Sequence, residues 1–322
     1  MKKRYALSLC LRFLVILLLV PLAGRAQTSE TTAAAPDTAQ GWRRGGVGTL
    51  NLSQVSLVNW APGGQSSLSV LALGNVFAHH RRGDNTFDTS LDLLYGTLKA
   101  GKARMRKNDD KLEYNAKYGH QFTKVLYYAA QVNVKTQLTP TKAIEKPDSL
   151  LSAFFAPAFI LASVGIDYKP NDQLSVFLSP ITGKFTVVAN QTLADAGAFG
   201  VEAARRGPDG RPLAGSGQRF RSELGAYLNI KYRKPLWENV VFQTKLDLFS
   251  NYLHNPQNID VNWENLISFK VNKFISSSIA TNLVYDDDVL VPLDRNGDGV
   301  PDGRGRRIQF KETLGIGLTY KF

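Results

Sequence analysis

The chain has 322 residues, a formal net charge of +12 and a single cysteine, Cys10. Charged residues make up 20% of the sequence, and the basic excess is spread along the chain rather than gathered in one patch. This diffuse charge suits an anionic lipid surface and does not indicate a nucleic-acid-binding protein.

The first 26 residues have the pattern of a secretory signal peptide. A basic start at residues 2–4 precedes an apolar run at residues 6–22, and small residues follow at Gly24 and Ala26. Small residues at these two positions define the cleavage site of signal peptides. We therefore expect residues 1–26 to be removed and the mature chain to begin at Gln27.

A transmembrane anchor is the alternative interpretation of this segment. Arg12 interrupts the apolar run, and the part after it is short for a membrane-spanning helix. Cleavage removes five basic residues, which lowers the net charge from +12 to +7. It also removes Cys10, so the mature chain would have no disulfide, no thiol catalysis and no cysteine-metal site.

Residues 27–44 have no hydrophobic periodicity, and we expect a short disordered periplasmic linker there. No apolar stretch after residue 26 has the length of a spanning helix. Residence in a membrane would therefore require a β-barrel, in which backbone groups pair between strands.

After the linker, the chain is a succession of segments in which apolar and polar residues alternate. In the clearest, residues 125–138, Leu126 and Val132 fall on one face and Gln131 on the other. These segments are longer than typical soluble strands and suit tilted, membrane-crossing strands. We expect an all-β fold over residues 45–322, an antiparallel transmembrane β-barrel of about twelve strands. The expected strands are residues 47–58, 67–80, 86–101, 110–120, 123–138, 153–169, 172–180, 217–233, 238–253, 257–272, 275–286 and 305–322.

The connections between these strands differ in length according to parity. Connections after even-numbered strands are short and those after odd-numbered strands are mostly long, except for residues 254–256. Short turns on one rim and long loops on the other are typical of a barrel with both termini in the periplasm. A soluble β-sandwich, the architectural alternative, gives no reason for this segregation. The short connections are residues 81–85, 121–122, 170–171, 234–237 and 273–274, and the long ones are 102–109, 139–152, 181–216 and 287–304.

The last strand ends the chain on an apolar ridge. Leu314, Ile316, Leu318, Tyr320 and Phe322 share one face, because strand side chains alternate. Such a ridge would face lipid, with the terminal aromatic side chain at the membrane interface. The ending resembles the signal by which barrels are recognised for insertion. We expect a location in the cell outer membrane, with outer-membrane lipid, lipopolysaccharide and the barrel-assembly machinery as partners.

The same alternation predicts an interior with seven acidic and seven basic side chains. A selective pore would be biased toward one sign of charge. Balanced charges instead favour ion pairing, so we expect a structural or interaction role with a largely charge-paired lumen that is closed to ions. A porin-like channel for small solutes is the alternative. The expected interior residues are Asp88, Asp92, Glu113, Glu223, Asp247, Asp260 and Glu264, with Lys117, Lys135, Arg221, Lys231, Lys245, Lys270 and Lys311.

A series of short motifs occurs at residues 41–46, 59–64, 109–119, 152–157, 178–184, 195–200, 249–252, 258–264 and 285–288. In their order and number they resemble a family of uncharacterised outer-membrane-type proteins from Bacteroidota, catalogued as domain of unknown function 3078. The resemblance implies an outer-membrane location. It implies no activity and no functional residues.

The sharpest chemical motif is the segment with Asp294, Asn296, Asp298 and Asp302. Oxygen ligands at alternate positions, with a glycine after the third, match the front of a calcium-binding loop. The acid expected at the twelfth position is missing, since Gly305 stands there. Calcium, the one candidate cofactor, and a plain solvated turn both remain open interpretations.

Three consecutive aspartates, residues 286–288, stand at the outer end of the eleventh strand. They would join a calcium site, bridge lipopolysaccharide phosphates through divalent ions, or simply form a charged strand end. A basic segment on the same rim would meet anionic headgroups or be merely solvated. Its residues are Lys102, Arg104, Arg106 and Lys107.

An outer-membrane hydrolase would need a histidine and an acid on the outward rim. The expected topology places His79, His80 and His120 near the short turns, on the opposite rim. His254 stands beside a short loop, six residues from Asp260. No nucleophile has a suitable spacing, and we expect no enzyme activity.

The loops at residues 139–152 and 181–216 are candidates for binding a partner. Within the second loop, residues 184–190 would form an extra hairpin or a plug that folds into the barrel.

Overall fold

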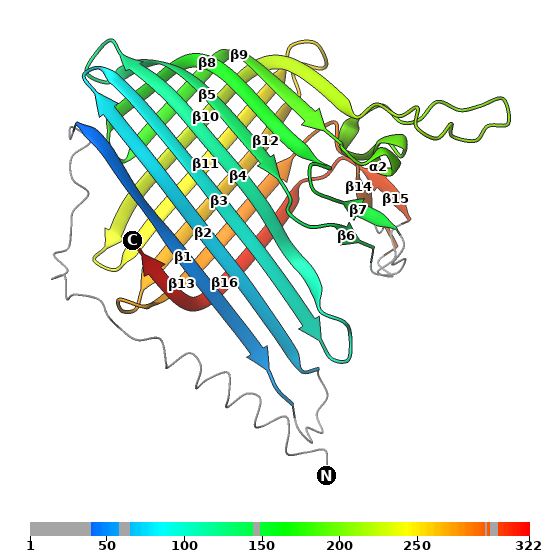
Figure 1. Cartoon of the computed structure of the whole chain (residues 1–322), viewed down its shortest axis with the longest axis horizontal. Helices are drawn as coiled ribbons and strands as arrows, with labels where there is room; N and C mark the ends of the chain where they lie inside the picture. Colours follow the sequence, from blue (N-terminus) through cyan, green and yellow to red (C-terminus); the bar gives the residue numbers. More distant parts are fainter. Residues whose placement is uncertain (1–39, 58–64, 144–148, 294, 297–301) are drawn as a thin grey trace. The chain divides into compact units, whose positions relative to one another are not determined.

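The computed structural model describes residues 40–57, 65–143, 149–293, 295–296 and 302–322 (Figure 1). Twelve strands of this part form one closed antiparallel barrel, in the order β1-β16-β13-β12-β11-β10-β9-β8-β5-β4-β3-β2. The predicted all-β barrel of about twelve strands is confirmed. The barrel strands are β1 (Gly41–Val55), β2 (Ser67–Arg82), β3 (Asn85–Ala100), β4 (Arg106–Gln121), β5 (Leu126–Thr136), β8 (Ala158–Asn171), β9 (Leu174–Val187), β10 (Phe220–Trp237), β11 (Val240–Asn251), β12 (Ile259–Lys270), β13 (Ile275–Tyr285) and β16 (Gln309–Lys321).

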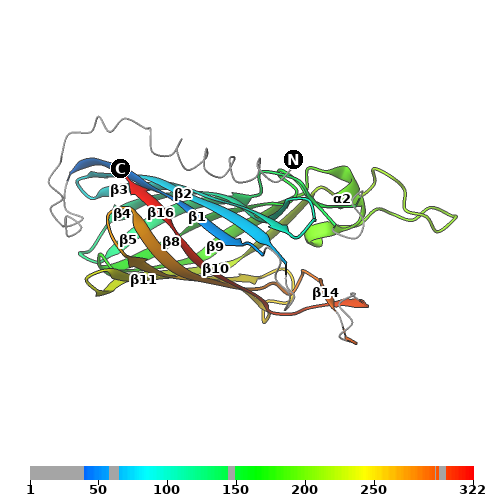
Figure 2. The ribbon, with the colours of Figure 1, turned by 90° about the horizontal axis from the view of Figure 1, so that it is seen from below.

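The predicted segregation of connections by length is also confirmed. Short turns join β2 to β3, β4 to β5, β8 to β9, β10 to β11 and β12 to β13, on the rim where β1 begins and β16 ends. We call this the terminal rim and the opposite one the loop rim. The longer connections at the loop rim carry additional short elements (Figures 1 and 2). These are β6 (Thr141–Lys142), β7 (Leu150–Ser152), α2 (Gln191–Asp195), η1 (Ala198–Gly200), β14 (Val291–Leu293) and β15 (Gly303–Gly305).

Some predicted boundaries are wrong. The expected linker ends at residue 44, whereas β1 begins at Gly41 and pairs with β2 from there. The expected turn at residues 234–237 is part of β10, which continues to Trp237 with a register shift next to Pro235. A proline lacks a backbone donor, and the irregular register allows the strand to pass it.

The largest correction concerns β9, which continues to Val187 instead of ending at residue 180. Residues 184–187 are therefore strand, and not the start of a hairpin or plug. The ladders to β8 and β10 both shift by one residue around Pro180, where β9 carries a bulge. Ser179 Oγ donates to a backbone carbonyl there, 2.8 Å away. The bulge lets the strand accommodate a residue without an N–H and changes which side chains face inward.

Polar side chains line the inside of the barrel and apolar side chains cover the outside. In β5, Gln131 and Asn133 are buried, whereas Tyr128 and Val132 are exposed. In β16, Leu314 is 71% exposed on the outer face. This distribution is the reverse of a soluble protein, in which large exposed apolar surface is rare.

Two connections at the loop rim pack against each other. A small apolar core joins Ala156, which precedes β8, to Val188, which follows β9, and to Leu193 and Ala194 of α2. Asn190 caps α2, since its side chain accepts a hydrogen bond from the Leu193 amide at 3.1 Å. The connection from residue 188 to residue 219 is thus anchored on the end of the barrel.

Candidate functional site

The interior of the barrel holds the candidate site, because charged side chains there meet across the lumen. Glu113 of β4 pairs with Lys245 of β11, with 2.7 Å between Oε1 and Nζ. Lys111 of β4 pairs with Glu264 of β12 at 3.3 Å. Five strands separate β4 from β12 in either direction around the barrel, so this pair spans the lumen from wall to opposite wall.

A second group of ion pairs lies closer to the terminal rim. Lys117 Nζ is 2.9 Å from an oxygen of Asp167, which is almost completely buried. Lys169 contacts Asp88 at 3.4 Å, and His79 Nδ1 lies 2.8 Å from the same carboxylate. These residues come from β2, β3, β4 and β8, so the group draws one side of the barrel wall together.

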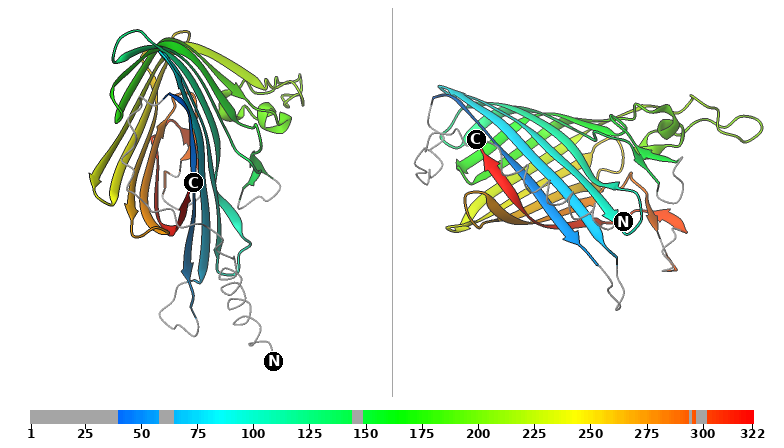
Figure 3. Two further views of the ribbon diagram at one scale, coloured as in Figure 1. Left: turned by 60° about the vertical axis from the view of Figure 1, so that its left-hand side comes forward. Right: turned by 60° about the horizontal axis from the view of Figure 1, so that its bottom comes forward.

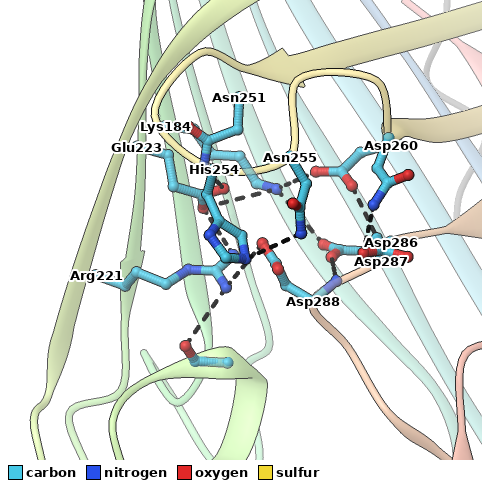
Figure 4. A network of polar contacts seen from close by, with 12 residues as sticks. Lys184, Arg221, Glu223, Asn251, His254, Asn255, Asp260, Asp286, Asp287 and Asp288 are labelled. Carbon is cyan, nitrogen blue, oxygen red and sulfur yellow. Dashed lines mark hydrogen bonds and ion pairs between the residues drawn. The ribbon is translucent and has the colours of Figure 1, made fainter.

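A third group closes the loop rim around Lys184 (Figure 4). Its Nζ lies 2.6 Å from Asp260 and 3.5 Å from Asp286. Arg221 pairs with Glu223 at 2.7 Å and with Asp288 at 3.2 Å. These contacts tie β9, β10 and β12 to the connection that follows β13, so loops and barrel wall share one polar network.

Aromatic side chains fill part of the interior between these groups. Phe177, Tyr227 and Phe249 form a buried apolar cluster with Ala129. Lys117 stands over the Phe177 ring at 4.8 Å from its centroid, an arrangement that favours a cation. Tyr227 donates its hydroxyl hydrogen to Asp247 at 2.5 Å. The lumen between β5 and β11 is therefore occupied by packed side chains.

The predicted interior residues are largely correct. Thirteen of the fourteen participate in ion pairs, hydrogen bonds or charge interactions inside the barrel. Lys311 pairs with Asp109 across the loop-rim side of the lumen. Lys270 has the parity of Asp260 and Glu264 and lies at the exposed end of β12, at the terminal rim.

Some charged residues of the interior are not in the predicted set, among them Lys111, Asp167, Lys169 and Lys184. Lys111, Asp167 and Lys169 follow the same alternation as the predicted residues, so period two was sufficient to find them. The inward position of Lys184 could not be predicted from the alternation, because the bulge at Pro180 shifts the inward face of β9 from odd to even positions.

The three aspartates 286–288 are held by basic side chains. Lys184 binds Asp286, Arg306 binds Asp287 at 3.1 Å, and Arg221 binds Asp288. This geometry favours the interpretation as a charged strand end over one in which free carboxylates bridge lipid phosphates. In the described residues no group of three or more His, Cys, Asp or Glu side chains is arranged to hold a metal ion.

The calcium prediction stays open. Asp294 and Asp298 lie outside the described residues. Asn296 and Asp302 are described, and Asp302 Oδ1 accepts a hydrogen bond from the Arg295 amide at 3.2 Å. The segment connects β14 to β15, a small hairpin at the loop rim.

The histidines lie as predicted. His79 and His80 lie near the end of β2, at the terminal rim. His120 lies at the same rim and is hydrogen-bonded to Asn85. His254 is at the loop rim and contacts the side chain of Asn255 at 3.2 Å. A small polar pocket surrounds it (Figure 4). The pocket is lined by Asn251, His254, Asn255, Asn258, Asp260, Asp287 and Asp288.

The predicted basic segment is only partly a loop. Lys107 belongs to β4, where its ammonium lies 2.6 Å from Asp110 and 2.6 Å from the Thr139 carbonyl. Lys102, Arg104 and Arg106 are exposed. Lys107 therefore fixes the adjacent connection to the barrel instead of contributing to a lipid-binding surface.

A closed barrel with an apolar outer surface and a polar, charge-paired interior defines an outer-membrane β-barrel protein. Among the described residues, no helix is long and apolar enough to cross a membrane. Residues 52–141 match the model of a family described as a protein of unknown function (DUF3078), which confirms the family resemblance over that part of the chain. No curated protein matches the sequence.

Several solved structures are similar to this chain in their arrangement of strands. The translocator domain of the autotransporter NalP from Neisseria meningitidis has a TM-score of 0.38 at 9% identity, covering 89% of this chain and 90% of its own. The COG4313 outer membrane channel from Pseudomonas putida F1 has a TM-score of 0.39 at 10% identity, covering 92% of this chain and 100% of its own. The NanC porin has a TM-score of 0.36 at 7% identity, covering 85% and 98%.

Proposed function

We propose that the protein is a structural or interaction barrel of the outer membrane whose lumen is closed to ions. The observation that carries the proposal is the pairing of Lys111 with Glu264 and of Lys245 with Glu113 between facing walls. An ion crossing the barrel would have to break these contacts or displace the aromatic cluster of Phe177 and Phe249. Both steps are costly, because the first would leave charges without partners inside the protein and the second would disrupt close-packed apolar side chains.

Planar-bilayer recordings on refolded protein test this function. The expected result is the absence of large, steady conductance from the natural sequence. The double variant Glu113→Ala/Lys245→Ala removes both partners of one pair and should give measurable conductance, which also proves insertion. Large steady conductance from the natural sequence would overturn the proposal.

A porin-like channel is the second candidate, and Lys231 favours it. This lysine faces the interior opposite Lys245 in the neighbouring strand, and its side chain is exposed there. Its exposure means that water reaches part of the lumen, and two adjacent ammonium groups would favour small anions. Anion-selective conductance that falls in Lys231→Gln would support the channel over the closed barrel.

The proposal includes no enzymatic activity. His254 contacts an asparagine amide, and the acids near it are engaged with Arg221, Arg306 and Lys184. Hydrolysis of lipid or peptide by the refolded protein, if abolished in His254→Ala, would contradict this part of the proposal.

The proposed partners follow from the two ends of the barrel. Exposed Lys102 and Arg104 at the loop rim suit the phosphates of outer-membrane lipid and lipopolysaccharide. Leu318, Tyr320 and Phe322 present the terminal ridge that we propose the barrel-assembly machinery recognises. Deleting residues 320–322 should reduce insertion in cells while leaving refolding in detergent measurable.

A further inference from the structure

The seam between β1 and β16 is paired over only part of its length. Its register runs from Val47 opposite Lys321 to Asn51 opposite Gly317. Backbone hydrogen bonds between Gly46 and Phe322, at 2.9 and 3.1 Å, extend it toward the terminal rim. The β2–β3 ladder, by contrast, runs without interruption from Ser67 to Arg82.

Toward the loop rim the two seam strands separate (Figure 3). In the described chain, residues 52–55 of β1 pair with β2 only, and residues 309–316 of β16 pair with β13 only. Continuing the register would place Val55 opposite Thr313. Both strands therefore present an unpaired edge to the same gap.

The outer side of this gap lies at the depth of the hydrocarbon. Leu52, Leu314 and Ile316 border its lower part and are strongly exposed on the outer face. Gln54 and Glu312 are exposed on the same face nearer the loop rim, so the part of the gap below them is the part that lies against hydrocarbon. Phe310, also exposed, stands further toward the loop rim, where an aromatic side chain marks the membrane interface. The gap thus opens between the middle of the membrane and its outer boundary.

Unpaired backbone groups are not tolerated against lipid chains at this depth. They are tolerated where they line a water-filled space, because water then satisfies each N–H and C=O. The edges at residues 52–53 and 314–316 must therefore face the aqueous interior. It follows that the lumen opens sideways through the wall at this point.

The paired part of the seam ends at a defined contact. Asn51 is only 7% exposed, and its amide lies directly over Gly315 and Gly317, where any side chain would collide with it. Beyond Asn51, the lumen side of the gap is bordered by Ser53 and Thr313, which are small and polar. Below Gln54 and Glu312 the gap is therefore apolar outside and hydroxyl-lined inside.

Basic side chains stand on the same edge strand and its lead-in. Lys311 pairs with Asp109 and keeps about half of its side chain exposed, at 47%. Arg307 is exposed and donates to the carbonyl of Arg306. An acyl chain fits the apolar border of the gap, and a phosphate-bearing head group fits Lys311 and Arg307.

We propose that the gap between β1 and β16 is a lateral binding site for a membrane lipid with an anionic, phosphate-bearing head group. The acyl chains lie against Leu52, Leu314 and Ile316, and the head group enters the lumen beside Lys311. The site opens through the side wall of the barrel, so it does not require transport through the barrel. This inference is independent of the closed lumen, because a conducting barrel could carry the same lateral site.

Cysteine cross-linking tests whether the seam is open, in a Cys10→Ser background that has no other cysteine. Thr49→Cys/Thr319→Cys is the matched control, since these hydroxyls lie 2.9 Å apart in the paired part. The control should form a disulfide readily, whereas Val55→Cys/Thr313→Cys should not. Equal disulfide formation by the two pairs would show that β1 and β16 pair along the whole seam, and would overturn the proposal.

Fluorescence quenching tests the occupant. A bimane label on Ser53→Cys is read in vesicles of phosphatidylglycerol or phosphatidylcholine with brominated acyl chains, with a label on Ser90→Cys of β3 as the control. We expect quenching at position 53, at least twofold stronger with phosphatidylglycerol, and little at position 90. Lys311→Gln/Arg307→Gln should remove the preference for the anionic lipid.

Two outcomes would overturn the lipid site. One is the absence of quenching at position 53 in both lipids. The other is protection of the label together with a doubled mass in detergent, which would show that a strand of a second copy fills the gap. Neither result depends on whether the lumen conducts.

Discussion

Glu113 of β4 and Lys245 of β11 meet inside the barrel with 2.7 Å between their charged atoms, although 132 positions separate them in the sequence. The Glu113 side chain is 5% exposed and also accepts a hydrogen bond from Asn133 at 2.9 Å. Too little water reaches the Glu113 carboxylate to take the place of the Lys245 ammonium group. This contact therefore binds two walls of the barrel to each other.

Removing one partner of this pair should destabilise the fold more than removing both. We expect Lys245→Met to lower the free energy of unfolding by about 1.5 to 3 kcal/mol, because Glu113 loses a charged hydrogen-bond donor and keeps only Lys111, 3.3 Å away, as an ionic partner. The double variant Glu113→Leu/Lys245→Met should recover a large part of that loss. Urea unfolding of refolded protein in lipid measures both. A double variant that is less stable than either single variant would contradict the ion-pair explanation.

The alternation of β9 beyond its bulge should be essential, because it determines that Lys184 faces the lumen. Deleting Pro180 would only remove the extra residue and leave Lys184 facing the lumen, whereas deleting Gly183, beyond the bulge, turns Lys184 toward lipid while its partner Asp260 stays inside. We expect the Gly183 deletion to prevent formation of the compact, heat-modifiable form on gel electrophoresis. Pro180→Ala keeps the number of residues and should fold. Normal folding of the Gly183 deletion would show that the register tolerates a shift.

Gly225 should not tolerate a side chain. A Cβ there would collide with the backbone carbonyl of Ser250 in the next strand, which cannot move without breaking the ladder. We expect Gly225→Ala to lower stability by roughly 2 kcal/mol or more, a typical cost of steric strain in a packed structure. Gly74→Ala is the control, since its Cβ would lie 3.7 Å from Leu93, an ordinary contact. Similar unfolding midpoints for the two variants would contradict this reasoning.

Asp195 should make the loop-rim connection sensitive to acid. The pKa of Asp195 is lowered below its ordinary value of 3.8 by hydrogen bonds from the Gly215 amide, the Gln191 side chain and the Gly217 amide. A lowered pKa means that these contacts are complete above the ordinary value and are lost as the pH falls through the lowered one. Amide exchange at Gly215 and Gly217 should therefore accelerate in acid beyond the intrinsic pH effect. Asp195→Asn should remove this extra pH dependence of the exchange rate. If the pH dependence persisted in this variant, a group other than Asp195 would be responsible for it.

Sequence periodicity was sufficient to place most side chains on the correct face of the wall. Gln131 and Asn133 face inward and Val132 outward, because adjacent strand residues always point to opposite faces. The bulge at Pro180 broke this rule in one strand, so Lys184 was missed. A proline can end a strand or be passed by a bulge, and only pairing with β8 and β10 decides between these outcomes.

The sequence by itself determined that the chain forms a barrel, which rim carries the long loops and that Leu314–Phe322 closes it as the last strand, since these depend on local alternation and spacing. The tertiary structure decided which charges meet, because Lys111 and Glu264 become neighbours only when the strands between them curve into a closed wall. It also decided that the terminal strand pairs with β1 over a short register and leaves the rest of its edge open. Period two contains no information about how far two distant strands remain side by side.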